Sequence, residues 1–362
     1  MNRIFKIVIL LLFLSMSFWA MGQKPAHYSS AEILHRMQKL NVLGNVLYVA
    51  AHPDDENTSM ITYMANEVKV NTAYFSFTRG DGGQNLIGPE FGDQLGVIRT
   101  QELLAARRTD RGSQYFSRAI DFGYSKNPEE TFSIWNKEEV LGDLVWIIRK
   151  FRPDIIITRF NTIPTNNHGH HTASAILAEE AFDLAANPNS YPDQLKFVST
   201  WQPKTLYWNT YPWFRSDYQR DTADLLSVDI GRYNPVLGMS YSEISALSRS
   251  NHKSQGFGAT GSRGLRKEYL QYEKGTKAEN NVFEVVDISW GRVSGGVKIQ
   301  KLVDQLISQY NAENPSASLS ALLEVRKNVQ QLKDEFWKDK KTAEIDALIA
   351  AVTGLYLENK CS

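Results

Sequence analysis

The chain has 362 residues, enough for one large α/β domain or for one domain with an appendage. Basic and acidic residues balance at 40 each, which gives no electrostatic reason to expect nucleic acid or an anionic membrane surface as a partner. The only cysteine, Cys361, is the penultimate residue. An internal disulfide is therefore excluded, and histidine and carboxylate are the strong ligands left for a metal site in the core.

The first 22 residues are typical of a secretory signal peptide. Arg3 and Lys6 form a basic start, residues 7–20 are apolar, and residues 20–22 form a small-residue cleavage site. The apolar run is short for a membrane span, and an uncleaved anchor is the alternative. Because no cysteine follows the run, we expect no lipoprotein anchor. The mature protein is expected in the periplasm or outside the cell, without stable membrane insertion.

Strand-like and helix-like segments alternate after residue 30. Short apolar runs predict strands at residues 46–50, 72–78, 117–121, 154–158 and 205–208. Helical spacing predicts helices at residues 30–40, 58–68, 97–109 and 138–150, and from the histidine tract through 185. Such alternation predicts an α/β fold, with a doubly wound, mostly parallel sheet and helices on both faces.

Three parts are expected along the chain: a signal peptide at 1–22, an α/β domain at 30–290 and a helical C-terminal segment at 296–362. Helical spacing at 319–340 and 342–357 supports the last part, beyond which a further region would fit. Residues 238–256 predict a helix running into a polar loop. Such a loop either covers an active site or is an ordinary connector.

The motif Ala51-His-Pro-Asp-Asp-Glu56 places an imidazole and two adjacent carboxylates directly after the first predicted strand. Zinc is bound by imidazole, thiolate and carboxylate, and catalytic zinc keeps three protein ligands and one open position. His52 and one of the two aspartates supply two of the three ligands. The alternative is that Asp54 or Asp55 only caps the helix that follows.

The third ligand is expected from His168, His170 or His171, which follow the fourth predicted strand. In the usual doubly wound order, the first and fourth strands are neighbours where the winding reverses, and ligands bind there beyond the strand ends. We therefore expect the two clusters to meet in one crevice. A surface tract with adventitious metal binding, or a helix start, is the alternative.

At Ala51–Glu56 and His168–His171 the sequence resembles the PIG-L or LmbE-like deacetylase family. These proteins are zinc hydrolases that remove N-acyl groups, most often acetyl, from glucosamine-containing molecules. Thr78-Arg-Gly-Asp-Gly-Gly83 and Arg99-Thr-Gln-Glu102 match the family as well, and the resemblance covers roughly residues 45–211. It implies a Rossmann-like sheet, in agreement with the alternation above.

The resemblance implies that His52, Asp55 and His171 bind zinc, and that Asp54 is the general base on the metal-activated water. It also implies that His168 polarises the carbonyl or protonates the leaving amine. Such help is needed because an amide is a poor electrophile with a poor leaving group. Two adjacent aspartates would then have different tasks.

His170 stands where the family often has an acidic residue, so His170 competes with His171 for the ligand position, although spacing favours His171. Substrate contact or support of the site is expected from further polar residues: Arg79, Asp81, Arg99, Glu102 and His170. For Arg99 and Glu102 the alternative is a surface pair one helical turn apart.

The sequence therefore predicts an exported zinc-dependent N-deacetylase acting on an amino sugar or an N-acetylglucosamine-containing glycan. Other divalent metals are expected to substitute for zinc, because nitrogen and oxygen ligands exclude them only weakly. The alternatives are a metal amidase acting on a non-sugar amide and a non-catalytic carbohydrate-binding protein. A dinucleotide oxidoreductase is disfavoured, since no Gly-x-Gly-x-x-Gly follows the first strand.

Overall fold

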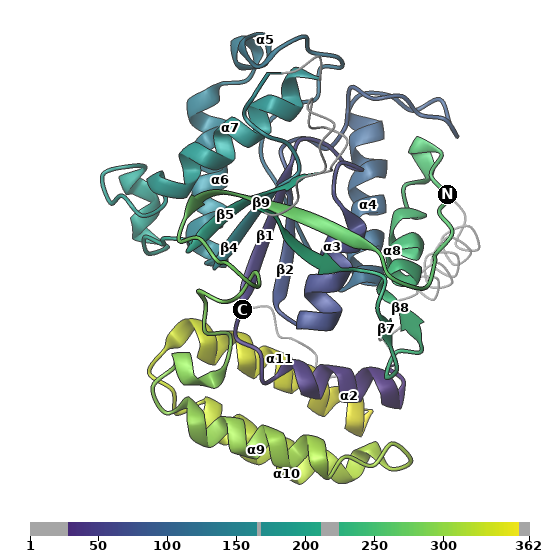
Figure 1. Cartoon of the computed structure of the whole chain (residues 1–362), viewed down its shortest axis with the longest axis vertical. Helices are drawn as coiled ribbons and strands as arrows, with labels where there is room; N and C mark the ends of the chain where they lie inside the picture. Colours follow the sequence, from purple (N-terminus) through teal and green to yellow (C-terminus); the bar gives the residue numbers. More distant parts are fainter. Residues whose placement is uncertain (1–27, 165–167, 211–223, 355–362) are drawn as a thin grey trace, which may run out of the picture.

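The computed structural model describes residues 28–164, 168–210 and 224–354. The predicted signal peptide and Cys361 lie outside these ranges. Figure 1 shows a central sheet with helices on both faces and a further layer of helices below it. Within the described ranges, none of the helices combines the length and apolarity needed to cross a membrane.

In the described part of the chain, seven strands form the main sheet in the order β3-β2-β1-β4-β5-β9-β6. Their bounds are β1 Asn45–Ala50, β2 Asn71–Ser76, β3 Ser113–Phe116, β4 Ile155–Thr158, β5 Thr205–Thr210, β6 Leu226–Asp229 and β9 Lys267–Gly275. Strands β1 to β5 pair in parallel, whereas β9 is antiparallel to both β5 and β6. Two short strands, β7 Tyr233–Asn234 and β8 Met239–Ser240, pair separately.

The central strands are mostly apolar and are buried along their whole length, as expected for parallel strands covered on both faces. Val46 of β1 pairs with Ile155 of β4, so the predicted neighbours at the reversal of winding are confirmed. The third strand was predicted at 117–121 and lies instead at Ser113–Phe116. Strands β6 and β9 were not predicted.

The helices of the described chain are α2 Ser30–Lys39, α3 Thr58–Tyr63, α4 Asp93–Asp110, α5 Pro128–Ile134, α6 Lys137–Phe151, α7 Gly169–Leu184, α8 Tyr241–Arg249, α9 Gly296–Ser308, α10 Leu319–Val329 and α11 Glu335–Thr353. A π-helical turn, η1 Met64–Val68, completes the helix predicted at 58–68. The last two helices separate before Glu335, earlier than predicted, because the Asp334 side chain caps α11 by accepting from Trp337 N.

Alternate side chains of β1 face opposite sides of the sheet. Leu47 and Val49 pack in one core with α6 and α7, whereas Val46 and Tyr48 pack in a second core with α3. Both faces are thus covered, and the open part of the sheet is its carboxyl edge.

A third core joins the two ends of the described chain. Ile33 and Met37 of α2 pack with Val303 of α9, Leu322 of α10 and Leu348 of α11. In Figure 1 these four helices form the layer below the sheet, with purple α2 against yellow α11. The helical C-terminal part therefore includes α2 in its packing, although α2 directly precedes β1 in sequence.

Candidate active site and metal centre

The two motifs meet at the carboxyl edge of the sheet. His52 lies two residues after β1, and the histidine tract opens α7 after β4, the strand paired with β1. The ring centre of His52 lies 4.9 Å from that of His168, 5.1 Å from that of His170 and 5.3 Å from that of His171. Residues more than 110 positions apart therefore share one crevice, as the strand order predicts.

Asp55 links two of the imidazoles. Its Oδ2 lies 3.0 Å from His52 Nδ1 and its Oδ1 lies 3.3 Å from His171 Nε2. The ligand atoms of these three residues all lie within 4.8 Å of one another. Ligands bound tetrahedrally at about 2.0–2.1 Å stand about 3.3 Å apart, so this donor set fits a divalent metal with little movement.

A second group of ligand atoms, from His52, His168 and His170, also lies within 4.8 Å. His52 Nε2 is 2.9 Å from His170 Nδ1, on the ring edge opposite Asp55. The His170 ring is buried, stacked 4.6 Å from Trp135, and its Nε2 has no hydrogen-bond partner among the described residues. Burial and the neighbouring His52 lower the pKa of His170 to about 2, so this ring is neutral.

Neither Asp54 nor Asp55 caps α3, so that alternative is wrong. The N-cap is Asn57, whose side chain accepts from Ser59 N and Met60 N. Asp54 has a φ of 96°, a conformation that residues other than glycine rarely adopt. The peptide at Asp54 is therefore held in place by its surroundings.

The two aspartates differ in electrostatics. Burial, with the neighbouring Asp55 and Glu56 carboxylates, raises the pKa of Asp54 to about 7. Burial would also raise the pKa of Asp55, but the His171 and His52 imidazoles outweigh it and lower that pKa well below its usual value. Asp55 is thus a stable anion, whereas Asp54 exchanges a proton near neutral pH.

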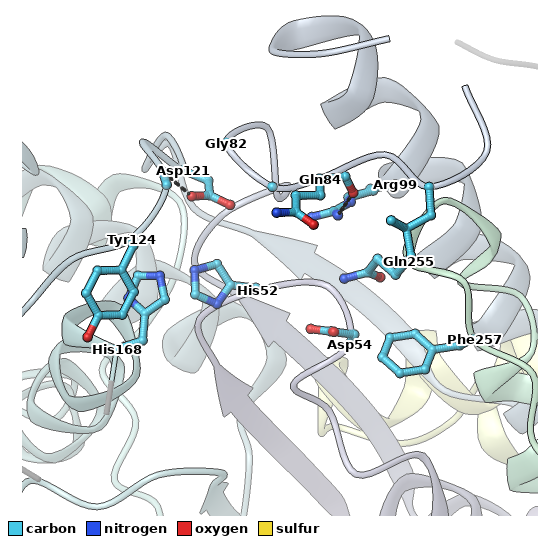
Figure 2. A pocket seen from close by; sticks show the side chains of 13 residues that line it. His52, Asp54, Gly82, Gln84, Arg99, Asp121, Tyr124, His168, Gln255 and Phe257 are labelled. Atoms are coloured by element: carbon cyan, nitrogen blue, oxygen red, sulfur yellow. Dashed lines mark hydrogen bonds between the residues drawn. The ribbon is translucent and has the colours of Figure 1, made fainter. Parts of the chain in front are cut away.

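His168 is the N-cap of α7 and also lines the cavity. Its Nδ1 accepts from His170 N at 3.2 Å, so the helix-start alternative holds for this residue. Burial, His52 and His171 lower the pKa of His168 to about 4. In Figure 2 the ring stands beside His52, on the side of the pocket where Tyr124 lies.

The pocket above these residues has a volume of about 430 Å³. His52, Asp54 and His168 line it, together with Gly82, Gly83, Gln84, Leu86, Arg99, Asp121, Gly123, Tyr124, Gln255 and Phe257. Tyr124 and Phe257 stand on opposite sides in Figure 2, and Gln84, Gln255 and Asp121 offer polar groups between them. The pocket therefore combines aromatic walls with a polar lining.

Arg99 and Glu102 are buried, so the alternative of a surface pair is wrong for them. Arg99 borders the pocket and donates to Gly80 O at 3.0 Å and to Gln84 O at 2.8 Å. A Cβ on Gly80, whose φ is 73°, would stand 2.6 Å from the Arg99 guanidinium, which explains the glycine there. Glu102 lies away from the pocket and accepts from Ser254 N and Oγ, both at 2.6 Å.

Arg79 and Asp81 bind each other at 2.9 Å, and neither lines this pocket. The sequence did not single out Asp121, Tyr124, Gln84, Gln255 or Phe257 as pocket residues. For Gln255 and Phe257 a signal existed, since the predicted polar loop after α8 does lie against the site. For Asp121 and Tyr124 the sequence offered none.

Comparison with known proteins finds a family model that matches the segment from β1 into α7. Residues 47–182 match the family model described as PIG-L: GlcNAc-PI de-N-acetylase, so the predicted resemblance is confirmed for this segment. The chain is 28% identical over 188 residues to 1D-myo-inositol 2-acetamido-2-deoxy-alpha-D-glucopyranoside deacetylase of Streptomyces avermitilis, covering 46% of this chain and 61% of that protein. It is 28% identical over 178 residues to mycothiol S-conjugate amidase of Streptomyces coelicolor, covering 45% and 60%.

The chain thus spans about three fifths of the length of these curated relatives. Among solved structures, N,N'-diacetylchitobiose deacetylase from Pyrococcus horikoshii is similar over 62% of this chain and 83% of its own, with 19% identity and a TM-score of 0.41.

Proposed function

We propose that the chain is an exported, metal-dependent hydrolase. The match of residues 47–182 to the PIG-L family model supports the hydrolase activity, and the signal-like first 22 residues support export. The proposed hydrolase removes an N-acetyl or other N-acyl group from an amino sugar or an N-acetylglucosamine-containing glycan. One observation carries the proposal: the ligand atoms of two imidazoles and one carboxylate converge within 4.8 Å, and a second carboxylate, that of Asp54, lines a pocket together with His52.

His52, Asp55 and His171 are the proposed ligands of the metal, and zinc is the first choice for this donor set. A divalent metal bound there lowers the pKa of water and stabilises negative charge on the amide oxygen. Other divalent metals are expected to support activity, since nitrogen and oxygen ligands discriminate weakly.

Asp54 is the proposed general base. It lines the cavity beside the ligands and is able to exchange a proton near neutral pH, as a base at working pH must. Asp55 remains an anion between two imidazoles, which suits a ligand better than a base.

His168 lines the same cavity, with its ring centre 4.9 Å from that of His52. Its proposed task is to polarise the amide carbonyl or to give a proton to the departing nitrogen. Neutral in the resting site, it is placed to donate a hydrogen bond to the substrate.

The substrate occupies the pocket of Figure 2, with the sugar between Tyr124 and Phe257 and its hydroxyls toward the polar lining. The relatives named as deacetylases of an N-acetylated sugar support this choice. The second candidate is an amidase for a non-sugar amide; its amidase part is favoured by the equal similarity, 28% identity, to a protein named mycothiol S-conjugate amidase.

Acetate release from N-acetylhexosamines and their oligomers, with and without a chelator, tests the proposal. We expect release that stops when the metal is removed and returns when zinc is added. Release only from amides without a sugar would favour the second candidate. Stoichiometric metal with no release from either class would remove both.

A further inference from the structure

The segment from α8 through η4 Lys253–Gln255 holds the turn that carries Asp54. This segment lies outside residues 47–182, the part that matches the family model. Arg249 Nη1 donates to Asp54 O at 2.6 Å, and Gln255 Nε2 donates to Pro53 O at 2.8 Å. Two consecutive carbonyls of the metal-site motif are therefore bound by one distant segment.

His252 reaches the same turn through Glu56. The Glu56 carboxylate accepts from Asp54 N at 2.8 Å through Oε2, and its Oε1 lies 2.7 Å from His252 Nε2. Because a carboxylate only accepts, the His252 ring carries its proton on Nε2. His252 and Glu56 are both fully buried, and Arg107 also approaches Glu56 Oε1, at 3.3 Å. Both the N–H and the carbonyl of Asp54 are thus fixed.

The segment is itself anchored to α4. Ser248 Oγ donates to Asp110 Oδ2 at 2.6 Å, and Ser254 donates twice to Glu102 at 2.6 Å. Leu86 N donates to Ser254 O at 2.8 Å, which ties the loop above the pocket to the same segment. These bonds fix the segment to α4, and the segment in turn restrains the turn around Asp54.

The conformation of Asp54 explains why such holding is needed. Its φ of 96° belongs to a region that persists in a non-glycine residue only when the surroundings impose it. Without the bonds to both peptide groups, this residue would relax toward an ordinary conformation. The carboxylate would then leave its position beside the ligands.

We propose that Arg249, His252 and Gln255 are positioning residues that keep the Asp54 carboxylate aligned for its part in the reaction. The proposal rests on the proposed role of Asp54 as the base. None of the three needs to touch the substrate for this effect, although Gln255 and Phe257 also line the pocket. Arg249 is the best of the three to substitute, because it is only partly buried and its replacement disturbs the packing least.

Arg249→Met keeps the apolar stem over Phe257, which the guanidinium now covers at 4.1 Å, and removes the donor to Asp54 O. We expect kcat for an N-acetyl amino sugar to fall by about 10- to 100-fold, the scale of an ångström of misplacement. KM and bound metal should stay within about twofold. Arg249→Lys, which keeps a cation of similar reach, should recover part of the loss.

Arg263→Met is the matched control. Like Arg249, Arg263 lies over an aromatic ring, that of Tyr233 at 5.2 Å, but its guanidinium binds the Glu243 carboxylate of α8 at 3.0 Å and not the Asp54 carbonyl. An equal fall of kcat in Arg263→Met would overturn the proposal, as would unchanged kcat in Arg249→Met. Loss of metal together with activity in Arg249→Met would overturn it as well.

Amide hydrogen exchange of the peptide covering residues 51–57 gives a second answer that does not depend on turnover. We expect faster exchange there in Arg249→Met and in His252→Gln, with no change in Arg263→Met and with melting temperatures close to that of the parent. Unchanged exchange in Arg249→Met would refute the inference that Arg249 restrains the turn that carries Asp54. If the parent protein hydrolyses no N-acetylated sugar, the proposed function fails while the exchange experiment still decides this inference.

Discussion

Gly169, the first residue of α7, sets how closely the histidine tract approaches the rest of the site. Its N–H donates to Ser125 O at 2.7 Å. A Cβ at this position would stand 2.2 Å from Asn127 O and 2.4 Å from Ser125 Oγ. Nonbonded heavy atoms settle at roughly 3.5 Å, so Gly169→Ala must displace the start of α7 by about 1 Å. That helix start carries His168 and His171.

Two effects of Gly169→Ala are expected. Overpacking should lower the free energy of unfolding by about 1–3 kcal/mol, which corresponds to a fall in melting temperature of several degrees. A displacement of about 1 Å at catalytic side chains should lower kcat by roughly 100-fold. Bound metal should weaken as well, because His171 moves relative to Asp55.

Calorimetry, elemental analysis and acetate release on the same preparation measure these effects. The matched control is Gly258→Ala, because an added Cβ there meets no heavy atom within 4 Å and its φ is ordinary. Gly258→Ala should behave like the parent. If Gly169→Ala also retains parental kcat and metal, the tight approach of α7 does not position the histidines, and the reasoning is refuted.

Three further outcomes are expected. Asp54→Asn and His168→Ala should keep the metal, and Asp54→Asn should lose roughly two to four orders of magnitude in kcat. Asp55→Ala and His171→Ala should lose the metal. Elemental analysis and turnover measured on the same preparations decide this, and loss of metal in His170→Ala alone would show that the ligands are assigned wrongly. Lys340 lies 3.0 Å from Asn45 Oδ1, and burial lowers its pKa from 10.5 to about 7. Between pH 7 and 10 the lysine therefore carries a proton in the unfolded chain but not in the folded one, so the free energy of unfolding should rise with pH by up to about 1.4 kcal/mol per pH unit. Lys340→Met should flatten this rise when the free energy of unfolding is measured by denaturant titration at several pH values. The same pH dependence in the parent and the variant would contradict the prediction. Exported protein should begin at or near Gln23 on N-terminal sequencing, and an intact Met1 would count against the signal peptide.

The parallel half of the sheet could be predicted because its strands are short apolar runs separated by helical spacing. Strand β9 escaped because its buried positions include Glu268, and its only fully buried apolar side chain is that of Leu270. A polar residue at a core-facing position removes the alternation on which strand prediction depends. The antiparallel strands at this end of the sheet, β9 and β6, could therefore not be predicted from the sequence.

The candidate site was predictable where a motif followed a strand, as at His52 and His171. The contacts that support the site from distant parts of the chain were not predictable. His252 and Glu56 are nearly 200 residues apart. Glu56 belongs to the motif after the first strand, but nothing in the sequence pairs it with His252. Only the tertiary fold shows that both are buried and in contact, because local patterns carry no information about partners so distant in the chain.

The packing of α2 against α9, α10 and α11 has a consequence for biosynthesis. The apolar face of α2, with Ile33 and Met37, emerges from the ribosome about 270 residues before Val303, its partner in α9. Contacts of such long range form late, because loop closure must precede them. Until then this apolar face stays exposed, which favours aggregation of the incomplete chain. Substitutions such as Met37→Lys should therefore reduce the yield of folded protein with little effect on the chemistry at the opposite end of β1.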